Sequence, residues 1–200
     1  MFDVFIIGGG VAGVSCALVL GSAKNKHFVT EKKIGILTHQ KTSSLQQALF
    51  NNAYGIPAGK TGAELMKESI SQLSNLYPHV QQIANEKVLS VSGSFPEFTV
   101  VTNKNSYQTR NIVITIGYAD TFAIEGLMKY VEPHQKTIPE KNRIQLRNVD
   151  HKIADGLYVA GNLAGWRSQL AIAAGSGAAV ATDILTLWNN GNHSQSHDKV

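Results

Sequence analysis

The segment from Asp3 to Gly13, Asp-Val-Phe-Ile-Ile-Gly-Gly-Gly-Val-Ala-Gly, constrains the fold of this chain more than any other. A short apolar run ends in glycines and passes directly into a helix-forming stretch. In such a unit the first glycine permits a tight turn, the second lets the backbone approach a pyrophosphate, and the third lets helix and strand pack closely. The helix N-terminus favours negative phosphates. The segment therefore predicts a dinucleotide site whose pyrophosphate lies at Gly8, Gly10, Val11, Ala12 and Gly13.

A carboxylate follows at the spacing typical of a ribose ligand. Glu31 lies 18 residues beyond Gly13, and an acidic residue about 20 residues past the glycines binds ribose hydroxyls in such units. We expect a second strand over residues 27–30, ending at Glu31. Because Lys32 and Lys33 follow directly, a solvated surface glutamate is the alternative interpretation.

The uncharged stretch over residues 4–20 has a second interpretation, as a signal peptide or a membrane span. No Lys or Arg precedes the run, Asp3 stands where a basic region belongs, and three consecutive glycines interrupt it. Residues 170–188 are also apolar, but they include Gly175, Gly177 and Asp183. The sequence therefore predicts no membrane insertion.

Composition excludes several classes of protein. Of the 200 residues, 43% are apolar and 16% are charged, as in ordinary globular domains. The net charge of +4 comes from scattered basic residues, and the seven histidines lack metal-ligand spacing, so we expect neither a nucleic-acid partner nor a metal. Cys16 is the only cysteine, which excludes a C-x-x-C redox pair. We expect a buried structural thiol and a reducing, cytoplasmic setting.

Patterns along the chain predict an α/β protein. We expect strands over residues 3–7, 27–30, 80–83, 88–91, 98–102, 112–116 and 156–161, and helices over residues 10–22, from 61 to about 77, and 168–188. Thr61-Gly-Ala-Glu64 predicts a capping box, and the helix after it places Leu65, Ile70, Leu73 and Leu76 near one face. The strand-like segments over residues 80–116 predict an antiparallel β-meander inserted into a Rossmann-like central parallel sheet. We expect one domain over residues 1–188 and a polar tail over residues 189–200.

Four motifs, taken together, resemble one known family. They are Val4-Phe-Ile-Ile-Gly-Gly-Gly-Val-Ala-Gly13; Asn52-Ala-Tyr-Gly-Ile-Pro57 with Gly62-Ala-Glu-Leu65; Ile112-Val-Ile-Thr-Ile-Gly117; and Gly156-Leu-Tyr-Val-Ala-Gly-Asn162 with Ser168-Gln-Leu-Ala-Ile-Ala-Ala-Gly175. Their order resembles the FAD-binding domain of the thioredoxin reductase-like pyridine nucleotide–disulfide oxidoreductases. The resemblance implies a three-layer FAD/NAD(P)-binding fold and FAD as the cofactor.

The resemblance also implies roles for individual residues. Asn52 would lie near the isoalloxazine, and Asn162 would hold a ribityl hydroxyl. The remaining implied cofactor contacts are Gly117, Gly161, Gln169, Leu170 and Ala171. If the helix that begins near Gln169 points at the flavin pyrimidine, its dipole would stabilise the negative charge that appears there upon reduction.

Three departures from the family pattern bear on function. Between Gly117 and Leu157 stand only about forty residues, with no second glycine fingerprint and no cysteine, where full-length members carry an NADPH-binding domain. Asn162 replaces the family's aspartate, and Thr115-Ile-Gly117 replaces Ala-Thr-Gly. The NADPH-to-disulfide relay is therefore not expected within this polypeptide.

Three functions remain open from the sequence. The first is an FAD-dependent oxidoreductase or electron-transfer protein that uses a separate electron donor. The second is a non-catalytic FAD-binding module with a structural, sensing or partner-recognition role. The third, a single-domain NAD(P)-dependent dehydrogenase, lacks support because no Tyr-x-x-x-Lys pair occurs. The gap left by the missing domain leaves room for a donor protein or for a second copy in a homodimer. No catalytic residue stands out.

Overall fold

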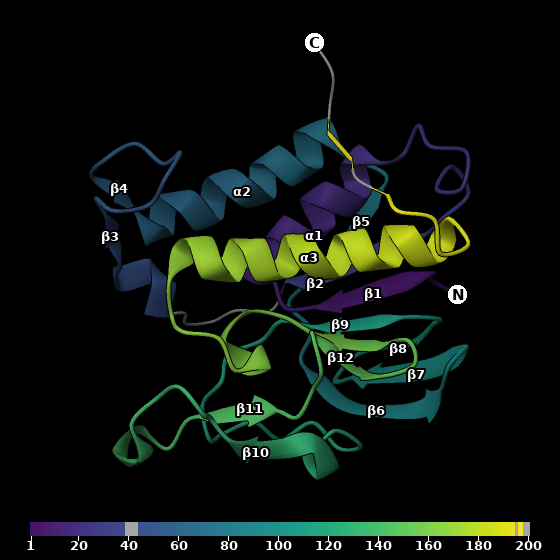
Figure 1. Ribbon diagram of the computed structural model, residues 1–200. Helices are drawn as coiled ribbons and strands as arrows, with labels where there is room; N and C mark the ends of the chain where they lie inside the picture. Colours follow the sequence, from purple (N-terminus) through teal and green to yellow (C-terminus); the bar gives the residue numbers. More distant parts are fainter. Residues whose placement is uncertain (39–43, 195, 198–200) are drawn as a thin grey trace.

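The computed structural model describes residues 1–38, 44–194 and 196–197 and has a layered α/β architecture (Figure 1). The central sheet has six strands in the order β12-β13-β9-β1-β2-β5. They are β1 (Val4–Ile7), β2 (Ile34–Thr38), β5 (Val80–Ala84), β9 (Ile112–Ile114), β12 (Lys152–Ala154) and β13 (Leu157–Val159). All neighbours pair in parallel except β12 and β13, which are antiparallel. The predicted fold class is confirmed, with one antiparallel edge strand added.

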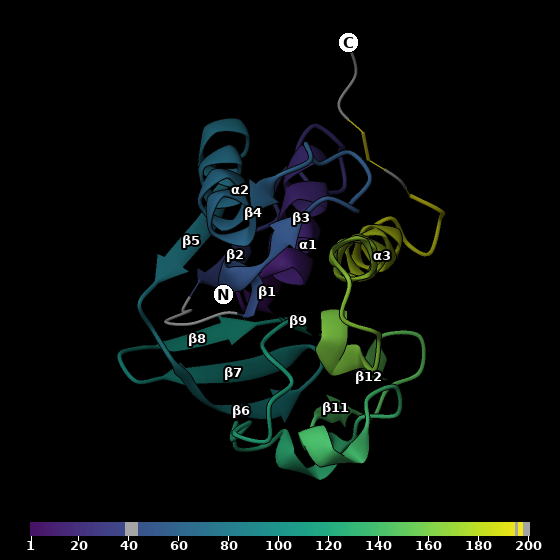
Figure 2. The same ribbon diagram turned by 90° about the vertical axis from the view of Figure 1, so that its left-hand side faces the viewer.

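Helices cover one face of this sheet and smaller sheets cover the other (Figures 1 and 2). The helices are α1 (Val11–Ser22), α2 (Gly62–Leu76) and α3 (Leu170–Trp188). The opposite face carries a meander of β6 (Val88–Ser94), β7 (Glu97–Thr102) and β8 (Ser106–Thr109), and a hairpin of β10 (Val131–Pro133) and β11 (Ile144–Leu146). The remaining short elements are β3 (Leu49–Phe50), β4 (Lys60–Thr61), and the 3-10 helices η1 (Ser44–Gln47), η2 (Met128–Tyr130), η3 (Pro139–Lys141) and η4 (Gly161–Ala164).

The alternation of side chains along β1 explains why the sheet has two buried faces. Val4 and Ile6 pack with α1 and α3, whereas Phe5 and Ile7 pack with the meander side. Successive side chains of a strand point to opposite faces, so a strand buried on both must be apolar throughout. The neighbouring β9 is buried over its whole length, as its apolar run predicts.

Small residues bring α1 and α3 unusually close together. A Cβ built at Gly177 of α3 would lie 1.9 Å from the carbonyl oxygen of Ala12. Ser15 of α1 donates a hydrogen bond of 2.8 Å to the carbonyl oxygen of Ala174. The alanine- and glycine-rich helix α3 therefore packs closely against α1. Cys16 is buried in the same core, and burial raises the pKa of its thiol.

Helix α2 begins with the predicted capping box. The Thr61 hydroxyl accepts a hydrogen bond from the Glu64 amide, and the Glu64 carboxylate accepts one from the Thr61 amide. Its apolar face is only partly covered: Leu73 is fully buried, but Leu76 is 52% exposed. Leu76 is the last residue of the helix, and the buried Tyr77 follows it directly.

Two strand predictions need correction. Residues 27–30 form turns after α1, and the second strand lies at residues 34–38 instead. The meander also differs from the prediction: residues 80–84 belong to the central sheet, and residues 106–109 supply the third meander strand. Residues 112–114 form a central strand, as their apolar run predicts. Periodicity identified strand-like segments but could not assign them to sheets, because pairing depends on distant residues.

One described helix is long and apolar enough to cross a membrane by length and composition alone. It is α3, which has 19 residues and a mean hydropathy of 1.6. The core helix of a globular protein passes the same test. Here Val180, Ala181, Ile184 and Leu185 of α3 are buried in the core shared with α1 and the sheet.

Candidate functional site

The glycine turn lies at the carboxyl end of β1, and its shape depends on two of its glycines. Gly8 has φ of +122°, and a Cβ there would lie 2.8 Å from the Thr115 carbonyl oxygen. A Cβ at Gly13 would lie 1.9 Å from the Gly8 carbonyl oxygen. The Thr115 hydroxyl donates to the same turn, with acceptor distances of 3.1 Å to Ile7 O and 2.9 Å to Gly8 O. The turn is thus fixed against the end of β9.

The first turn of α1 leaves its N-terminus open to an anion. Gly10 is the N-cap residue, no described side chain caps it, and no acidic residue stands in the first turn. The first N–H groups of a helix have no intrahelical acceptor. Together with the helix dipole they form a site for a phosphate.

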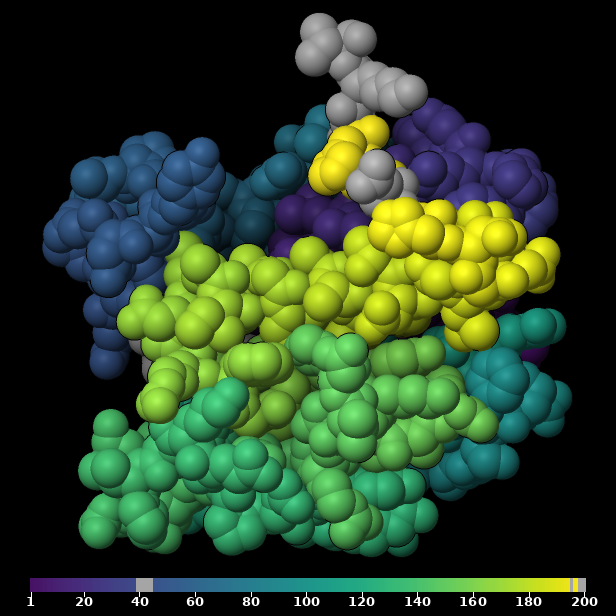
Figure 3. Space-filling view, in the orientation of Figure 1, coloured from purple at the N-terminus to yellow at the C-terminus, as the bar shows by residue number. Residues whose placement is uncertain are grey.

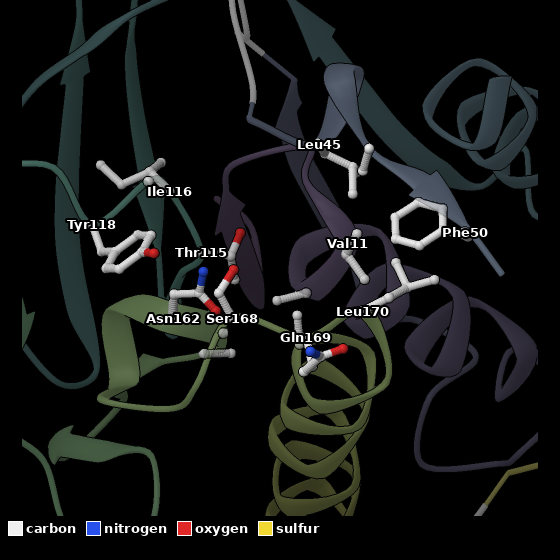
Figure 4. A pocket seen from close by; sticks show the side chains of 16 residues that line it. Val11, Leu45, Phe50, Thr115, Ile116, Tyr118, Asn162, Ser168, Gln169 and Leu170 are labelled. Atoms are coloured by element: carbon white, nitrogen blue, oxygen red, sulfur yellow. The ribbon is translucent and has the colours of Figure 1, made fainter. Parts of the chain in front are cut away.

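A cavity of about 330 Å³ lies beside this turn (Figure 4). It is lined by Val11, Ala12, Leu45, Ala48, Phe50, Thr115, Ile116, Gly117, Tyr118, Ala160, Gly161, Asn162, Ser168, Gln169, Leu170 and Ala173. Figure 4 shows apolar side chains such as Leu45 and Phe50 on one side, facing the polar groups of Thr115, Asn162 and Ser168 on the other. A cavity with apolar walls and a few convergent polar groups is typical of a cofactor site.

Asn162 carries the most informative atom in the cavity wall. Its side-chain oxygen Oδ1 is buried and has no hydrogen-bond partner among the described residues. Its backbone oxygen, in contrast, is held by His134 Nε2 at 3.1 Å and by the Gly165 amide at 2.9 Å. Buried polar atoms are almost always hydrogen-bonded. The orphaned oxygen therefore points to a ligand that donates a hydrogen bond, such as a hydroxyl group.

Helix α3 also begins at the cavity. Its N-cap residue is Gln169, which caps it through no described side-chain hydrogen bond, and Gln169 and Leu170 line the cavity. Ala171 does not. It lines a separate apolar groove of about 250 Å³ between α1, α2 and α3. The open end of α3 is thus directed at the cavity, as its predicted role requires.

A smaller cavity of about 200 Å³ touches the other side of the glycine turn. Gly8, Leu37 and Ile116 line it, and Ile116 also lines the first cavity. Glu86, on its wall, accepts hydrogen bonds from Thr102 at 2.6 Å, Asn105 at 2.7 Å and Tyr107 at 2.9 Å. The Thr102 hydrogen bond is the main cause that lowers the pKa of the Glu86 carboxyl. The two cavities share Ile116 and both lie at the carboxyl end of β1.

Most of the predicted cofactor residues meet in this region. Those that line the larger cavity are Val11, Ala12, Gly117, Gly161, Asn162, Gln169 and Leu170. Gly8, Gly10 and Gly13 form the turn between the cavities. The sequence assigned no cofactor role to Thr115, Tyr118, Ser168, Leu45 or Phe50, because no spacing rule connects these residues across the fold.

Besides Ala171, two predicted residues lie elsewhere. Glu31 precedes β2, whose first residue Ile34 pairs with Val4 at the amino end of β1. It therefore lies at the edge of the sheet opposite the glycine turn, and its assignment as the ribose ligand is wrong. The cause is the misplaced strand: the buried Val29 and its neighbours close a turn through hydrogen bonds to Lys26. The carboxyl end of β2 is Thr38, and residues 39–43 after it lie outside the described part.

Asn52 is the second displaced residue. It lies in an exposed turn of the loop between β3 and β4 and does not line the cavity. The neighbouring Asn51 uses its side chain to close the loop, accepting a hydrogen bond from the Gly59 amide at 2.9 Å.

A buried network supports the Asn162 wall from behind. The Gly161 amide donates to Ser176 Oγ at 2.8 Å, and Ser176 Oγ lies 2.8 Å from His151 Nε2. The indole N–H of Trp166 donates to the same Nε2 at 3.1 Å. Because Nε2 is an acceptor, the ring proton sits on Nδ1, which lies 3.8 Å from Asp150 Oδ1, too far for a hydrogen bond. Burial is the main cause that lowers the pKa of His151, so the neutral ring is favoured.

The fold and the cavity define the class of protein first: an α/β protein with the fold of FAD/NAD(P)-binding proteins and a cavity at the carboxyl ends of parallel strands. A thioredoxin reductase from Gloeobacter violaceus has a similar structure, with a TM-score of 0.73 and 16% identity, covering 100% of this chain and 98% of that chain. At this identity the likeness shows the fold alone.

Sequence comparison then identifies the family. The profile of the pyridine nucleotide-disulphide oxidoreductase family matches residues 2–177, and the chain belongs to this family. A ferredoxin–NADP reductase of Leuconostoc mesenteroides is 27% identical over 197 residues, covering 97% of this chain and 52% of the relative. An uncharacterized oxidoreductase of Bacillus velezensis is 26% identical over 148 residues, covering 67% of this chain and 41% of the relative. The chain thus spans about half the length of these curated relatives.

Proposed function

We propose that this chain binds FAD and acts as a flavin-dependent oxidoreductase that receives electrons from a separate donor. The observation that carries the proposal is the buried, unpaired Oδ1 of Asn162, in a cavity that adjoins an uncapped glycine turn. The family membership supports an oxidoreductase, and the described residues fit FAD.

The fit rests on three parts of the site. The glycine turn and the first amides of α1 would hold the pyrophosphate. The Asn162 oxygen would accept a hydrogen bond from a ribityl hydroxyl, and the N-terminus of α3 would face the flavin and favour negative charge on it. The smaller cavity, on the far side of the turn, would take the adenosine end. When bound, FAD supplies reversible two-electron chemistry, while the protein supplies orientation and electrostatics.

The composition of the cavity wall keeps a second function open, a non-catalytic FAD-binding module. Among the described lining residues there is no Asp, Glu, His, Lys, Arg or Cys. Side-chain acid–base or thiol chemistry within the cavity is therefore not supported. Bound flavin that no protein or nicotinamide donor reduces would favour this module over the oxidoreductase.

Substitution of Gly117 tests the cofactor directly. A Cβ at Gly117 has no atom within 4 Å, and the residue lines the cavity. The side chain of Gly117→Leu should therefore occupy the cavity without displacing neighbouring protein atoms. Gly175 is equally open but lies outside the cavity, which makes Gly175→Leu the matched control. We expect the wild type and Gly175→Leu to carry FAD, released by denaturation and identified by its spectrum. Gly117→Leu should carry none, while its Tm should equal that of the wild-type apoprotein. Equal flavin in all three proteins would refute this placement.

Reduction by NADPH tests the need for a separate donor. With no second glycine fingerprint in the sequence, the flavin-loaded protein should not be bleached rapidly by NADPH alone in a stopped-flow experiment. Rapid bleaching without any partner would show that a separate donor is unnecessary.

A further inference from the structure

A positively charged surface lies on the rim of the larger cavity, on the β10–β11 loop and on the segment before α3. We name it the rim patch. It consists of Lys136, Ile138, Lys141, Arg143, Trp166 and Arg167.

Three contacts attach this surface to the cavity wall. His134, at the start of the β10–β11 loop, is bonded to the Asn162 backbone oxygen at 3.1 Å. The Arg143 guanidinium lies 5.2 Å from the ring centre of Tyr118, which lines the cavity. Arg167 donates to the Lys136 backbone oxygen at 3.4 Å and directly precedes the cavity residues Ser168 and Gln169. A protein seated on the rim patch would thus stand next to the cavity mouth.

The charge on the rim patch is not neutralised internally. Of the four cations, none forms an ion pair with a carboxylate in the described part of the chain. Glu140 is the one carboxylate within residues 134–143, against three basic residues there. Excess charge of one sign on a surface attracts an oppositely charged partner and speeds association.

Apolar groups lie among these charges. Trp166 is 39% exposed and Ile138 is 58% exposed. The Lys136 ammonium lies 4.1 Å from the Trp166 ring centre, and the indole N–H of Trp166 is anchored on His151. A pre-ordered tryptophan and arginine within a charged surface is typical of the energetic centre of a protein interface. Figure 3 shows residues around 130–145, in green, directly beside the start of α3 on one face of the molecule.

We propose that the rim patch is the docking surface for a small acidic electron-carrier protein that delivers electrons to the cavity. This inference rests on the proposed function, because it supplies the partner of that flavin site. The cations come from separate stretches of chain and surround apolar side chains, as suits contact with the surface of another protein. A single phosphate would instead need several donors that converge on one point. Each molecule of a reduced two-iron ferredoxin would be oxidised by one electron, so two encounters supply the two electrons of a full flavin reduction, with protons drawn from solvent.

Charge reversal tests the proposal with an acidic two-iron ferredoxin and an acidic flavodoxin as probes. The test variant is Lys136→Glu with Arg167→Glu. The control is Lys24→Glu with Lys33→Glu, which changes the net charge equally at exposed positions on the opposite edge of the sheet. Binding of the oxidised carriers is measured by calorimetry, which does not need flavin in the protein. Flavin reduction by the reduced carriers is followed by stopped flow, with dithionite as a donor that needs no docking surface.

We expect the rim variant to associate roughly tenfold more slowly at low ionic strength, with a weaker salt dependence. The control variant should associate with the carriers at the wild-type rate, and dithionite should reduce the flavin of all three proteins at the same rate. The proposal would be overturned if both double variants lost carrier association equally, or if the rim variant lost none. A wild type that binds neither carrier would also overturn it. A rim variant that instead loses reduction by NADPH would assign the rim patch to a dinucleotide. Absence of flavin with intact, rim-dependent carrier binding would refute the proposed function and leave the docking surface standing.

Discussion

The two walls of the cavity are built by different means. The glycine-turn wall comes from one short stretch of chain, and its shape follows from steric limits at Gly8 and Gly13. The opposite wall, at Gly161 and Asn162, is held from behind by His134, His151 and Ser176, which come from three distant parts of the sequence. At Gly8 and Gly13 of the first wall, there is no room for a side chain larger than hydrogen. The second is held by hydrogen bonds and leaves one buried acceptor unpaired.

This difference predicts that substitutions at the first wall mainly change the stability of the fold, whereas substitutions at the second wall mainly change ligand binding. A wall that depends on steric fit should lose its structure when a methyl group is added. A wall that depends on hydrogen bonds should respond to changes of donor, acceptor or charge with smaller and more specific effects. Each prediction below tests one side of that comparison.

The largest effect is expected at the glycine-turn wall. In Gly13→Ala the new Cβ would lie 1.9 Å from the Gly8 carbonyl oxygen, so the turn must open. We expect a loss of about 3 kcal/mol in the free energy of unfolding, measured by urea denaturation. Gly175→Ala, at an open helical position, should be neutral or slightly stabilising. Equal midpoints for the two variants would show that the turn does not limit stability.

At the opposite wall, Asn162→Asp should change binding and stability in opposite directions. A carboxylate accepts a stronger hydrogen bond than an amide, so FAD retention should improve by about 1 kcal/mol, the difference between a charged and a neutral hydrogen bond. Without FAD, the buried charge should lower the stability of the apoprotein. Asn162→Leu, which removes the acceptor, should weaken retention. Flavin titrations and apoprotein Tm values measure both effects, and unchanged affinity in Asn162→Asp would mean that the side chain does not face the cofactor.

Removal of the Ser176 hydroxyl, which lies behind the same wall, should lower the free energy of unfolding by a moderate amount. Ser176→Ala leaves the Gly161 amide without its acceptor and takes one neighbour from His151. A buried unpaired donor costs about 1–3 kcal/mol. Ser15→Ala is the control, since Ser15 only donates to the Ala174 carbonyl oxygen of α3. Urea denaturation should show the larger loss for Ser176→Ala, and the reverse order would contradict the network.

The smallest effect concerns pH. Burial lowers the pKa of His151 from its ordinary value of 6.5, so its neutral ring stabilises the fold above pH 6.5. The unfolded chain takes up the proton more readily, and this stability is lost as the pH falls through the folded-state pKa. The Tm difference between the wild type and His151→Gln should therefore shrink on acidification. His79 shifts in the same direction but is present in both proteins, so it cancels. A difference that is constant with pH would contradict a neutral acceptor role.

The sequence by itself determined the parts of the protein that short-range chemistry controls. The β1–turn–α1 unit, the capping box at Thr61 and Glu64, and the buried strand β9 all follow from sterics, backbone donors or an unbroken apolar run. Of the seven predicted cofactor residues that line the cavity, Val11 and Ala12 follow from the glycine motif. The other five, Gly117, Gly161, Asn162, Gln169 and Leu170, follow from the resemblance to the family.

Only the tertiary structure decided where β2 begins, which strands form the meander, and what stands behind Asn162. Residues 27–30 have the composition of a strand, yet they close a turn because Val29 is buried in the core shared with α1. The pairing of His151 with Ser176 and of Lys136 with Trp166 joins residues whose separation in sequence carries no signal. Such contacts depend on how distant segments meet once the core is closed, so the orphaned oxygen of Asn162 and the rim patch emerge only from the folded chain.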